Sequence, residues 1–82
     1  MYYVYILKCA DKSLYTGTTN NIGRRIHEHN AGTGAHYTKI HRPVVLLHSE
    51  PHATLSEALK REMQIKKWTR KKKLDLVRSD HV

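Results

Sequence analysis

The sequence has no phenylalanine, one cysteine, two prolines and no long apolar run. Its single cysteine, Cys9, excludes an internal disulfide and fits a reducing cytoplasm. No stretch is apolar over a length that would span a bilayer, and the run 2–7 has neither the basic segment nor the cleavage site of a signal peptide. We therefore expect a soluble, cytoplasmic protein. Its 82 residues predict a single domain, 1–82, with a thin core.

Acidic residues are also scarce. Aspartate and glutamate number 7 against 15 lysines and arginines, which gives a formal net charge of +8. Such an excess indicates a polyanionic partner, most often a nucleic acid. An anionic membrane would attract the same charge, but the basic segment 66–73 lacks the broad hydrophobic face of a membrane-binding helix. Nucleic acid is the favoured partner, and a basic surface that only aids solubility is the alternative.

The periodicity predicts a small α/β (α+β) domain of order β-β-α-β-α-α. Its sheet has three strands, begins with an antiparallel hairpin and is flanked by helices. Asn20 or Asn21 caps the first helix and Gly32 ends it, Thr54 opens the second with capping-box spacing, and Thr69 caps the third. The expected elements are strands 2–7 and 14–18, a helix to about residue 30, a loop 31–42, a strand 43–48, a helix to about residue 68 and a short helix with Leu74 and Val77.

Two polar residues fall on or beside the apolar face of the first helix. Ile22 and Ile26 mark that face, Arg25 lies beside it, and His29 lies nearly in its middle, four residues after Arg25. Spacing alone favours the plainer interpretation, in which Arg25 extends outward and His29 is a satisfied, partly buried histidine. The alternative is a functional pair.

A carboxylate falls on the apolar face of the second helix. Leu55, Ala58 and Leu59 are expected to define this face, and Glu62 projects from its middle two turns after Leu55. A carboxylate that faces the core is costly unless it is paired, hydrogen-bonded or bound to a metal. A salt bridge to an arginine at the edge of the core and a metal-binding role are equally compatible with the spacing.

Tyrosines dominate the aromatic residues, and Tyr3, Tyr5 and Tyr15 lie in the hairpin. A phenol on a strand is usually a core aromatic with a hydrated tip. Beside an arginine, a histidine and a glutamate, it completes the parts needed for phosphodiester hydrolysis. An arginine binds phosphate, a carboxylate holds Mg²⁺, and a phenol or imidazole accepts a proton from water.

Four elements in order resemble the GIY-YIG nuclease family, and the resemblance covers essentially the whole chain. They are Tyr3-Val4-Tyr5, Tyr15-Thr16-Gly17, the helix with Arg25 and His29, and Arg61-Glu62. Small single-domain bacterial members are most similar. The N-terminal domain of the repair protein UvrC and the homing endonucleases are larger relatives with separate DNA-binding domains.

The resemblance implies a role for each matching residue. Tyr5 and Tyr15 match the motif tyrosines, one of which is proposed to activate or position water. Gly17 matches a glycine that lets the backbone pass close to the site, and Arg25 matches the catalytic arginine. The remaining matches are His29 as an assisting histidine, Glu62 as the metal-binding glutamate, and His36, beside Tyr37, as a further active-site histidine.

Three departures from the family pattern are present. Tyr3 replaces the first motif glycine, and Thr16 replaces the motif isoleucine. Several family nucleases carry a late asparagine near the site, whereas no asparagine follows Glu62. Without an added DNA-binding domain, sequence-specific targeting would require a protein partner.

The basic segment near the C-terminus is the other strong feature. It is either a solvated helix face or a sequence-blind contact to the phosphate backbone, with Trp68 stacking on an exposed base. We favour the second interpretation. The predicted nucleic-acid-binding residues are Lys66, Lys67, Trp68, Arg70, Lys71, Lys72 and Lys73.

Seven histidines raise the possibility of zinc, but the chain has no Cys-x-x-Cys and no His-Glu-x-x-His. A structural zinc site is therefore disfavoured. Cys9 ends a buried strand, where inert packing is favoured over a nucleophilic role.

The sequence therefore predicts a Mg²⁺- or Mn²⁺-dependent DNA endonuclease, structure-selective and acting in repair or recombination, with RNA as a substrate not excluded. A non-catalytic nucleic-acid-binding module with the same fold is the main alternative. A basic protein that packs against ribosomal RNA is a third.

Overall fold

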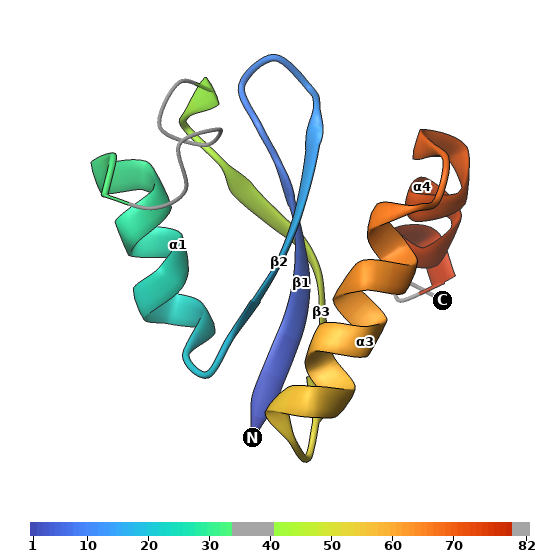
Figure 1. Ribbon diagram of the computed structural model, residues 1–82. Coiled ribbons are helices and arrows are strands. Elements are labelled where there is room, and N and C mark those ends of the chain that lie inside the picture. The colour runs from blue at the N-terminus through green and yellow to red at the C-terminus, as the bar shows by residue number, and fades with distance from the viewer. Residues whose placement is uncertain (34–40, 80–82) are drawn as a thin grey trace.

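The computed structural model describes residues 1–33 and 41–79, in which one three-stranded antiparallel sheet lies between helices (Figure 1). The order β-β-α-β-α-α and the α+β class are as predicted. Over the same residues, no helix has the length and apolar character needed to cross a membrane. The elements are β1 (Tyr2–Lys8), β2 (Leu14–Thr19), α1 (Ile22–Ala31), β3 (Val45–His52), α3 (Leu55–Lys66) and α4 (Arg70–Ser79).

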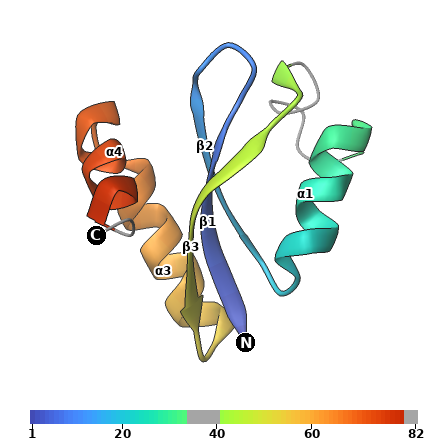
Figure 2. The ribbon, with the colours of Figure 1, turned by 180° about the vertical axis from the view of Figure 1, so that it is seen from behind.

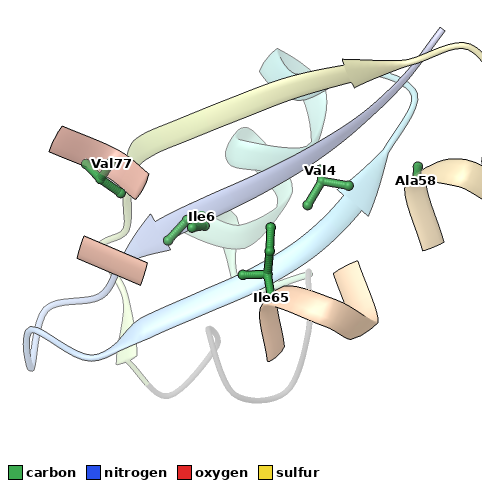
Figure 3. Packing of buried hydrophobic residues seen from close by; sticks show 5 residues of the cluster. All are labelled: Val4, Ile6, Ala58, Ile65 and Val77. Atoms are coloured by element: carbon green, nitrogen blue, oxygen red, sulfur yellow. The ribbon is translucent and has the colours of Figure 1, made fainter. Parts of the chain in front are cut away.

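Strand β1 is central in the sheet order β2-β1-β3 and is covered on both faces. Val4 and Ile6 on one face pack into a cluster with residues of α3 and α4 (Figure 3). Tyr5 and Leu7 on the other face pack with the inward side chains of α1. Figure 2 shows α1 on one side of the sheet and the α3–α4 pair on the other. This double burial explains why the run 2–7 is apolar and aromatic without alternation.

The caps of α1 are those that the sequence predicts. The side chain of Asn21 accepts a hydrogen bond from the backbone N–H of Arg24 at 3.0 Å. At the other end, Gly32 adopts a left-handed conformation with φ of 84°, and its N–H donates to the carbonyls of the last turn. Asn30, in that last turn, holds the backbone of Val44 with its side-chain amide. Its Oδ1 accepts from the N–H of Val44 at 2.7 Å, and its Nδ2 donates to the carbonyl of Val44 at 3.3 Å. The end of α1 is thereby tied to the segment that enters β3.

Local caps also fix the start of the two C-terminal helices. Thr54 accepts from the N–H of Glu57 at 3.2 Å, and Thr69 accepts from the N–H of Lys72 at 3.2 Å. Both threonines were predicted as caps. The second helix ends with Lys67 as its C-cap, slightly before the predicted end near Trp68.

Two sequence predictions about these elements were wrong. The third strand was placed at 43–48, but β3 spans Val45–His52, because its register with β1 continues to the pair Tyr2 and His52. As an edge strand, it tolerates Pro51. In addition, Leu55 and Leu59 were expected to face the core but are 45% and 44% exposed.

The buried face of α3 is formed instead by Ala58 and Ile65, both fully buried. Residues 61 and 62 lie between them along the helix and are partly buried. The core-facing stripe is therefore rotated from the predicted one, and Arg61 and Glu62 both lie over the sheet. This rotation lets Glu62 reach Thr18 at one edge of the sheet and Arg61 reach Glu50 at the other.

Candidate active site

An aromatic cluster lies between the sheet and α1. The phenol oxygen of Tyr5 lies 3.0 Å from Nε2 of His29, and both side chains are almost completely buried. The ring of Tyr15 packs edge-on against His29, with 5.4 Å between ring centroids, and lies 6.5 Å from the ring of Tyr5. His29 is thus inside the core, as its place on the helix predicts, and it has a hydrogen-bond partner from the motif strand.

Gly17 is required by the path of the Tyr5 side chain. The two residues pair across β1 and β2. A Cβ added to Gly17 would meet Cζ of Tyr5 at 2.6 Å, far inside van der Waals contact. Because the phenol crosses the backbone here, only glycine leaves it room. The motif glycine therefore has a clear physical reason in this chain, namely the placement of a phenol.

Arg25 lies at the solvent side of this cluster, with its side chain 31% exposed and Nη1 3.2 Å from the carboxylate of Glu28. Burial raises the pKa of Tyr5, although the hydrogen bond from Arg25 opposes the rise. Burial, assisted by the charge of Arg25, lowers the pKa of His29. At neutral pH the phenol is therefore protonated and the imidazole is neutral. Because a guanidinium can only donate, the phenol accepts from Arg25 and can donate its own proton to His29.

Glu62 lies on the opposite face of the same edge strand. Its Oε1 accepts a hydrogen bond from the hydroxyl of Thr18 at 2.5 Å, and its Oε2 pairs with Nζ of Lys66 at 2.7 Å. The side chain is only 16% exposed. The arginine pairing considered from the sequence is not the contact formed, because the partner is a lysine one turn along α3.

The two halves of the site meet at the edge of β2. Tyr5 passes over Gly17, and Thr18, the next residue, holds Glu62 on the other face. After burial, the negative charge of Glu62 is a further, small cause that raises the pKa of Tyr5. One short stretch of edge strand therefore separates a cationic and aromatic half from an acidic half.

The acidic half suits a hard divalent cation better than a thiophilic one. Within the described ranges, no group of three histidine, cysteine or acidic residues is placed to hold a metal ion. Mg²⁺ commonly binds one or two carboxylates, keeps several waters and takes further oxygens from substrate phosphates. One partly buried carboxylate at an open strand edge fits this pattern, provided that the half-exposed Lys66 moves aside.

The basic segment spans the end of α3 and the start of α4, and most of its cationic side chains are exposed. Trp68 differs from the expectation that it is available for stacking. It is partly buried against the core cluster, with Arg61 and Lys72 at 5.0 and 4.5 Å from its ring centroid. A base would have to displace these cations to stack on the indole.

Sequence reasoning missed several residues and could not place others. His36 and Tyr37 lie outside the described residues. Thr18, which anchors Glu62, was missed, although its position directly after the motif glycine marks it as a neighbour of the site. A cluster around Glu50 on β3 was also missed. The alternation of His48, Glu50 and His52 along one strand was a signal for it.

Comparisons with known proteins identify the family and support the fold. The family described as "GIY-YIG catalytic domain" matches residues 1–75. A UPF0213 protein of Staphylococcus aureus is 53% identical over 77 residues, which cover 94% of each chain. A solution structure of a UPF0213 protein from Bacillus halodurans has a TM-score of 0.60 at 42% identity, covering 94% of this chain and 83% of that one. A solution structure of an E. faecalis protein has a TM-score of 0.65 at 45% identity, covering 98% and 85%.

Proposed function

This chain belongs to the GIY-YIG family, a superfamily of nucleases, and on that premise we propose that it is a metal-dependent endonuclease that hydrolyses phosphodiester bonds of DNA. The observation that carries the proposal is the meeting of two sets of groups at one strand edge. Arg25 with the Tyr5–His29 pair lies on one side, and Glu62 lies on the other. These are the groups that a phosphoryl-ester hydrolase requires.

The cationic half binds and orients the substrate. Arg25 is partly exposed beside the buried phenol, so its guanidinium can donate two parallel hydrogen bonds to the scissile phosphate. Negative charge develops on those oxygens during attack, and the arginine stabilises it. Its present partner, Glu28, is a partly exposed neighbour three residues along the helix, so a phosphate can replace it at small cost.

A proton relay through Tyr5 follows from the protonation states. A phenol that is protonated at neutral pH cannot act as a base alone. His29 is completely buried and Tyr5 is 1% exposed, so the proposed relay requires that the bound substrate brings the attacking water to the Tyr5 oxygen. There Tyr5 takes a proton from that water while it passes its own proton to Nε2 of His29, 3.0 Å away. Tyr15, packed on His29 and partly exposed, is the competing candidate for this role.

The divalent ion that the family's nucleases generally use would be held by Glu62, with the hydroxyl of Thr18 fixing the carboxylate. When bound, such an ion neutralises charge on the phosphate and helps to orient the water. We propose Mg²⁺ or Mn²⁺ as this ion. We also propose that the basic segment 66–73 contacts the DNA backbone, that branched or single-stranded DNA is preferred, and that a protein partner supplies targeting.

The relay is tested by comparing Tyr5→Phe with Tyr15→Phe. Removal of the relaying phenol is expected to lower the cleavage rate by about 10²- to 10⁴-fold, the usual contribution of general acid–base catalysis. The pKa of His29 is lowered, so the activity of the wild-type protein should be constant near neutrality and fall only when the pH drops through that lowered value. If Tyr15→Phe causes the larger loss, Tyr15 has the role assigned to Tyr5.

The proposed function is tested by incubating the purified protein with labelled branched, flapped, single-stranded and duplex DNA and a matched RNA, in Mg²⁺, Mn²⁺ or EDTA. Cutting should require the metal and should be lost in Glu62→Ala and Arg25→Ala. Arg24→Ala is the matched control, since Arg24 is exposed and its side chain bonds only to Asn20, at 3.2 Å, among the contacts described. If every protein binds DNA without cutting it, the chain is a non-catalytic binding module and the proposal is wrong.

A further inference from the structure

A hollow of about 300 Å³ lies on the Glu62 side of β2. It is lined by Leu14, Tyr15 and Thr16 of β2, by Lys66 of α3 and by Lys73 of α4. Lys66 also contacts the proposed active site, through its ion pair with Glu62. The hollow therefore adjoins the acidic half of the site along the edge of the sheet.

The hydroxyl of Thr16 has no hydrogen-bond partner among the residues that the structure describes. The side chain is only 4% exposed. Leaving a buried hydroxyl unpaired costs free energy, whereas valine has almost the same shape without that cost. Packing alone therefore gives no reason for a threonine at this position.

Two lysines line the same hollow. Lys73 has no ion pair within the described ranges, and it is partly buried, unlike its exposed neighbours on α4. Lys66 is half-exposed, and its ammonium pairs with the carboxylate of Glu62. An unpaired hydroxyl donor beside two cations is suited to an oxyanion with several acceptor oxygens.

The position of the hollow defines which anion fits. Thr18, which holds Glu62, and Thr16, which lines the hollow, are two residues apart and point to the same face of β2. Two residues along a strand span roughly 6.6 Å. This step is comparable to one nucleotide of DNA backbone. On α3, Glu62 lies beside Thr18, and Lys66, one helical turn further on, lies beside the hollow.

We propose that this hollow is a phosphate subsite, in which Thr16, Lys66 and Lys73 bind the DNA backbone phosphate next to the scissile one. The inference rests on the proposed function, because the neighbouring phosphate is defined relative to the cleaved one. Leu14 supplies apolar surface for the sugar between the two phosphates. The subsite fixes the register of the strand without reading its sequence.

The test is an NMR titration in EDTA, so that no cutting occurs, with thymidine 3′,5′-bisphosphate, thymidine 5′-monophosphate and inorganic phosphate as probes. The bisphosphate carries two phosphates one nucleoside apart. It should bind about tenfold more tightly than the monophosphate, as expected for added charge-assisted hydrogen bonds, and should shift the amide signals of residues 14–16. Equal affinity for the two nucleotides in the wild-type protein would overturn the proposal.

Four variants locate the effect. Lys73→Gln and Thr16→Val should reduce the affinity for the bisphosphate to that for the monophosphate, and Thr16→Ser should retain most of the gain. Lys60→Gln is the matched control, because Lys60 is exposed on α3 and lies outside both the hollow and the basic segment 66–73. If Lys60→Gln acts like Lys73→Gln, the gain comes from diffuse charge and the subsite does not exist.

Thr16→Val also separates binding from folding. Because the hydroxyl is unpaired, the midpoint of thermal unfolding should stay the same or rise while binding weakens. A rise in the midpoint with unchanged bisphosphate affinity would show that the hydroxyl contacts no ligand. Inorganic phosphate could shift the amide signals of residues 14–16 and bind with the same affinity as the bisphosphate. In that case the hollow holds free phosphate, and its assignment to DNA is wrong.

Failure of this inference is distinguishable from failure of the proposed function. Glu62→Ala should lose cutting but keep the tenfold preference for the bisphosphate. If neither the wild-type protein nor any variant cuts DNA but the preference for the bisphosphate remains, the chain is a binding module that holds a DNA strand. Cutting without the preference removes only the subsite.

Discussion

Two partly buried carboxylates lie at opposite edges of the same sheet, and their surroundings differ. Thr18, Val4 and Glu50 form a row across the three strands. From α3 above this row, Glu62 reaches Thr18 at the β2 edge, and Arg61 reaches Glu50 at the β3 edge. The two carboxylates are similarly buried, with Glu62 16% and Glu50 19% exposed. Burial alone therefore does not distinguish them.

The difference lies in their partners. Oε1 of Glu50 accepts from Nε of Arg61 at 2.6 Å and lies 3.2 Å from Nε2 of His52, while Oε2 lies 2.9 Å from Nε2 of His48. Burial raises the pKa of a carboxyl, yet the hydrogen bonds from Arg61 and the two histidines hold the pKa of Glu50 below its ordinary value. Glu62 has only two partners among the contacts described, the hydroxyl of Thr18 and the ammonium of the half-exposed Lys66. A carboxylate with replaceable partners can accept a ligand, whereas a saturated one stabilises the fold.

The largest expected effect is on cleavage. Glu62→Gln should lower the rate by about 10³-fold, since the several kcal/mol that a bound metal contributes to the transition state depend on the carboxylate. Glu50→Gln should leave the rate unchanged below its unfolding temperature. The measurement is single-turnover cleavage of the preferred DNA substrate. Equal losses in the two variants would show that the saturated carboxylate also serves the reaction.

The opposite ranking is expected for stability. Glu50→Gln should lower the free energy of unfolding by about 1–3 kcal/mol, because Arg61 and the buried His48 lose their ionic acceptor. The partial exposure of the pair places the loss at the lower end of this range. Glu62→Gln should change stability by less than about 1 kcal/mol, because glutamine can still accept from Thr18 and an ion pair with the half-exposed Lys66 contributes little. Urea denaturation followed by circular dichroism measures both. A larger loss for Glu62→Gln would reverse the structural assignment.

The pH dependence of stability should identify Glu50 directly. A carboxyl whose pKa is lowered on folding adds stability above its unfolded pKa, and that stability disappears as the pH falls through the folded value. The wild-type protein should therefore lose its advantage over Glu50→Gln as the pH drops below about 4.5, the ordinary value for this carboxyl. Thermal unfolding of both proteins from pH 7 to pH 3 tests this. Parallel curves would mean that the Glu50 cluster does not supply the difference.

The fold was largely predictable because its boundaries depend on local chemistry. Asn21, Gly32, Thr54 and Thr69 cap helices with their own side chain or backbone, and a sequence pattern contains that information. The end of β3 was not predictable in this way, because it is set by pairing with β1 far away in the chain.

The site was only partly predictable for a related reason. Helical spacing places His29 and Glu62 toward the interior, and both positions were expected. The partners of Glu62 and of Arg61 were not, because adjacent residues on α3 reach opposite edges of the sheet. Which edge each side chain reaches depends on the angle at which α3 crosses the strands, and no local sequence pattern encodes that angle. The predicted stripe of Leu55 and Leu59 was wrong for the same reason.

The smallest expected effect tests whether Lys66 is replaceable. Its ammonium pairs with the carboxylate oxygen that a metal would use, so Lys66→Gln should raise the affinity of the free protein for Mn²⁺. An exposed ion pair contributes up to about 1 kcal/mol, which sets the increase at about two- to fivefold. Mn²⁺ titration in the absence of DNA, followed by broadening of the amide signal of Glu62, measures the affinity.

Lys67→Gln is the matched control for charge, because it removes the same charge from the adjacent exposed residue. If both variants raise Mn²⁺ affinity equally, Lys66 does not compete with the metal, and the ion pair with Glu62 has no role in gating it. Glu50 supplies an internal reference in the same spectra. Because Arg61 and two histidines occupy both of its oxygens, Mn²⁺ should not broaden the signals around Glu50 in any of the three proteins. Broadening there would show that saturation does not protect a carboxylate from a metal ion, and the distinction between the two edges would fail.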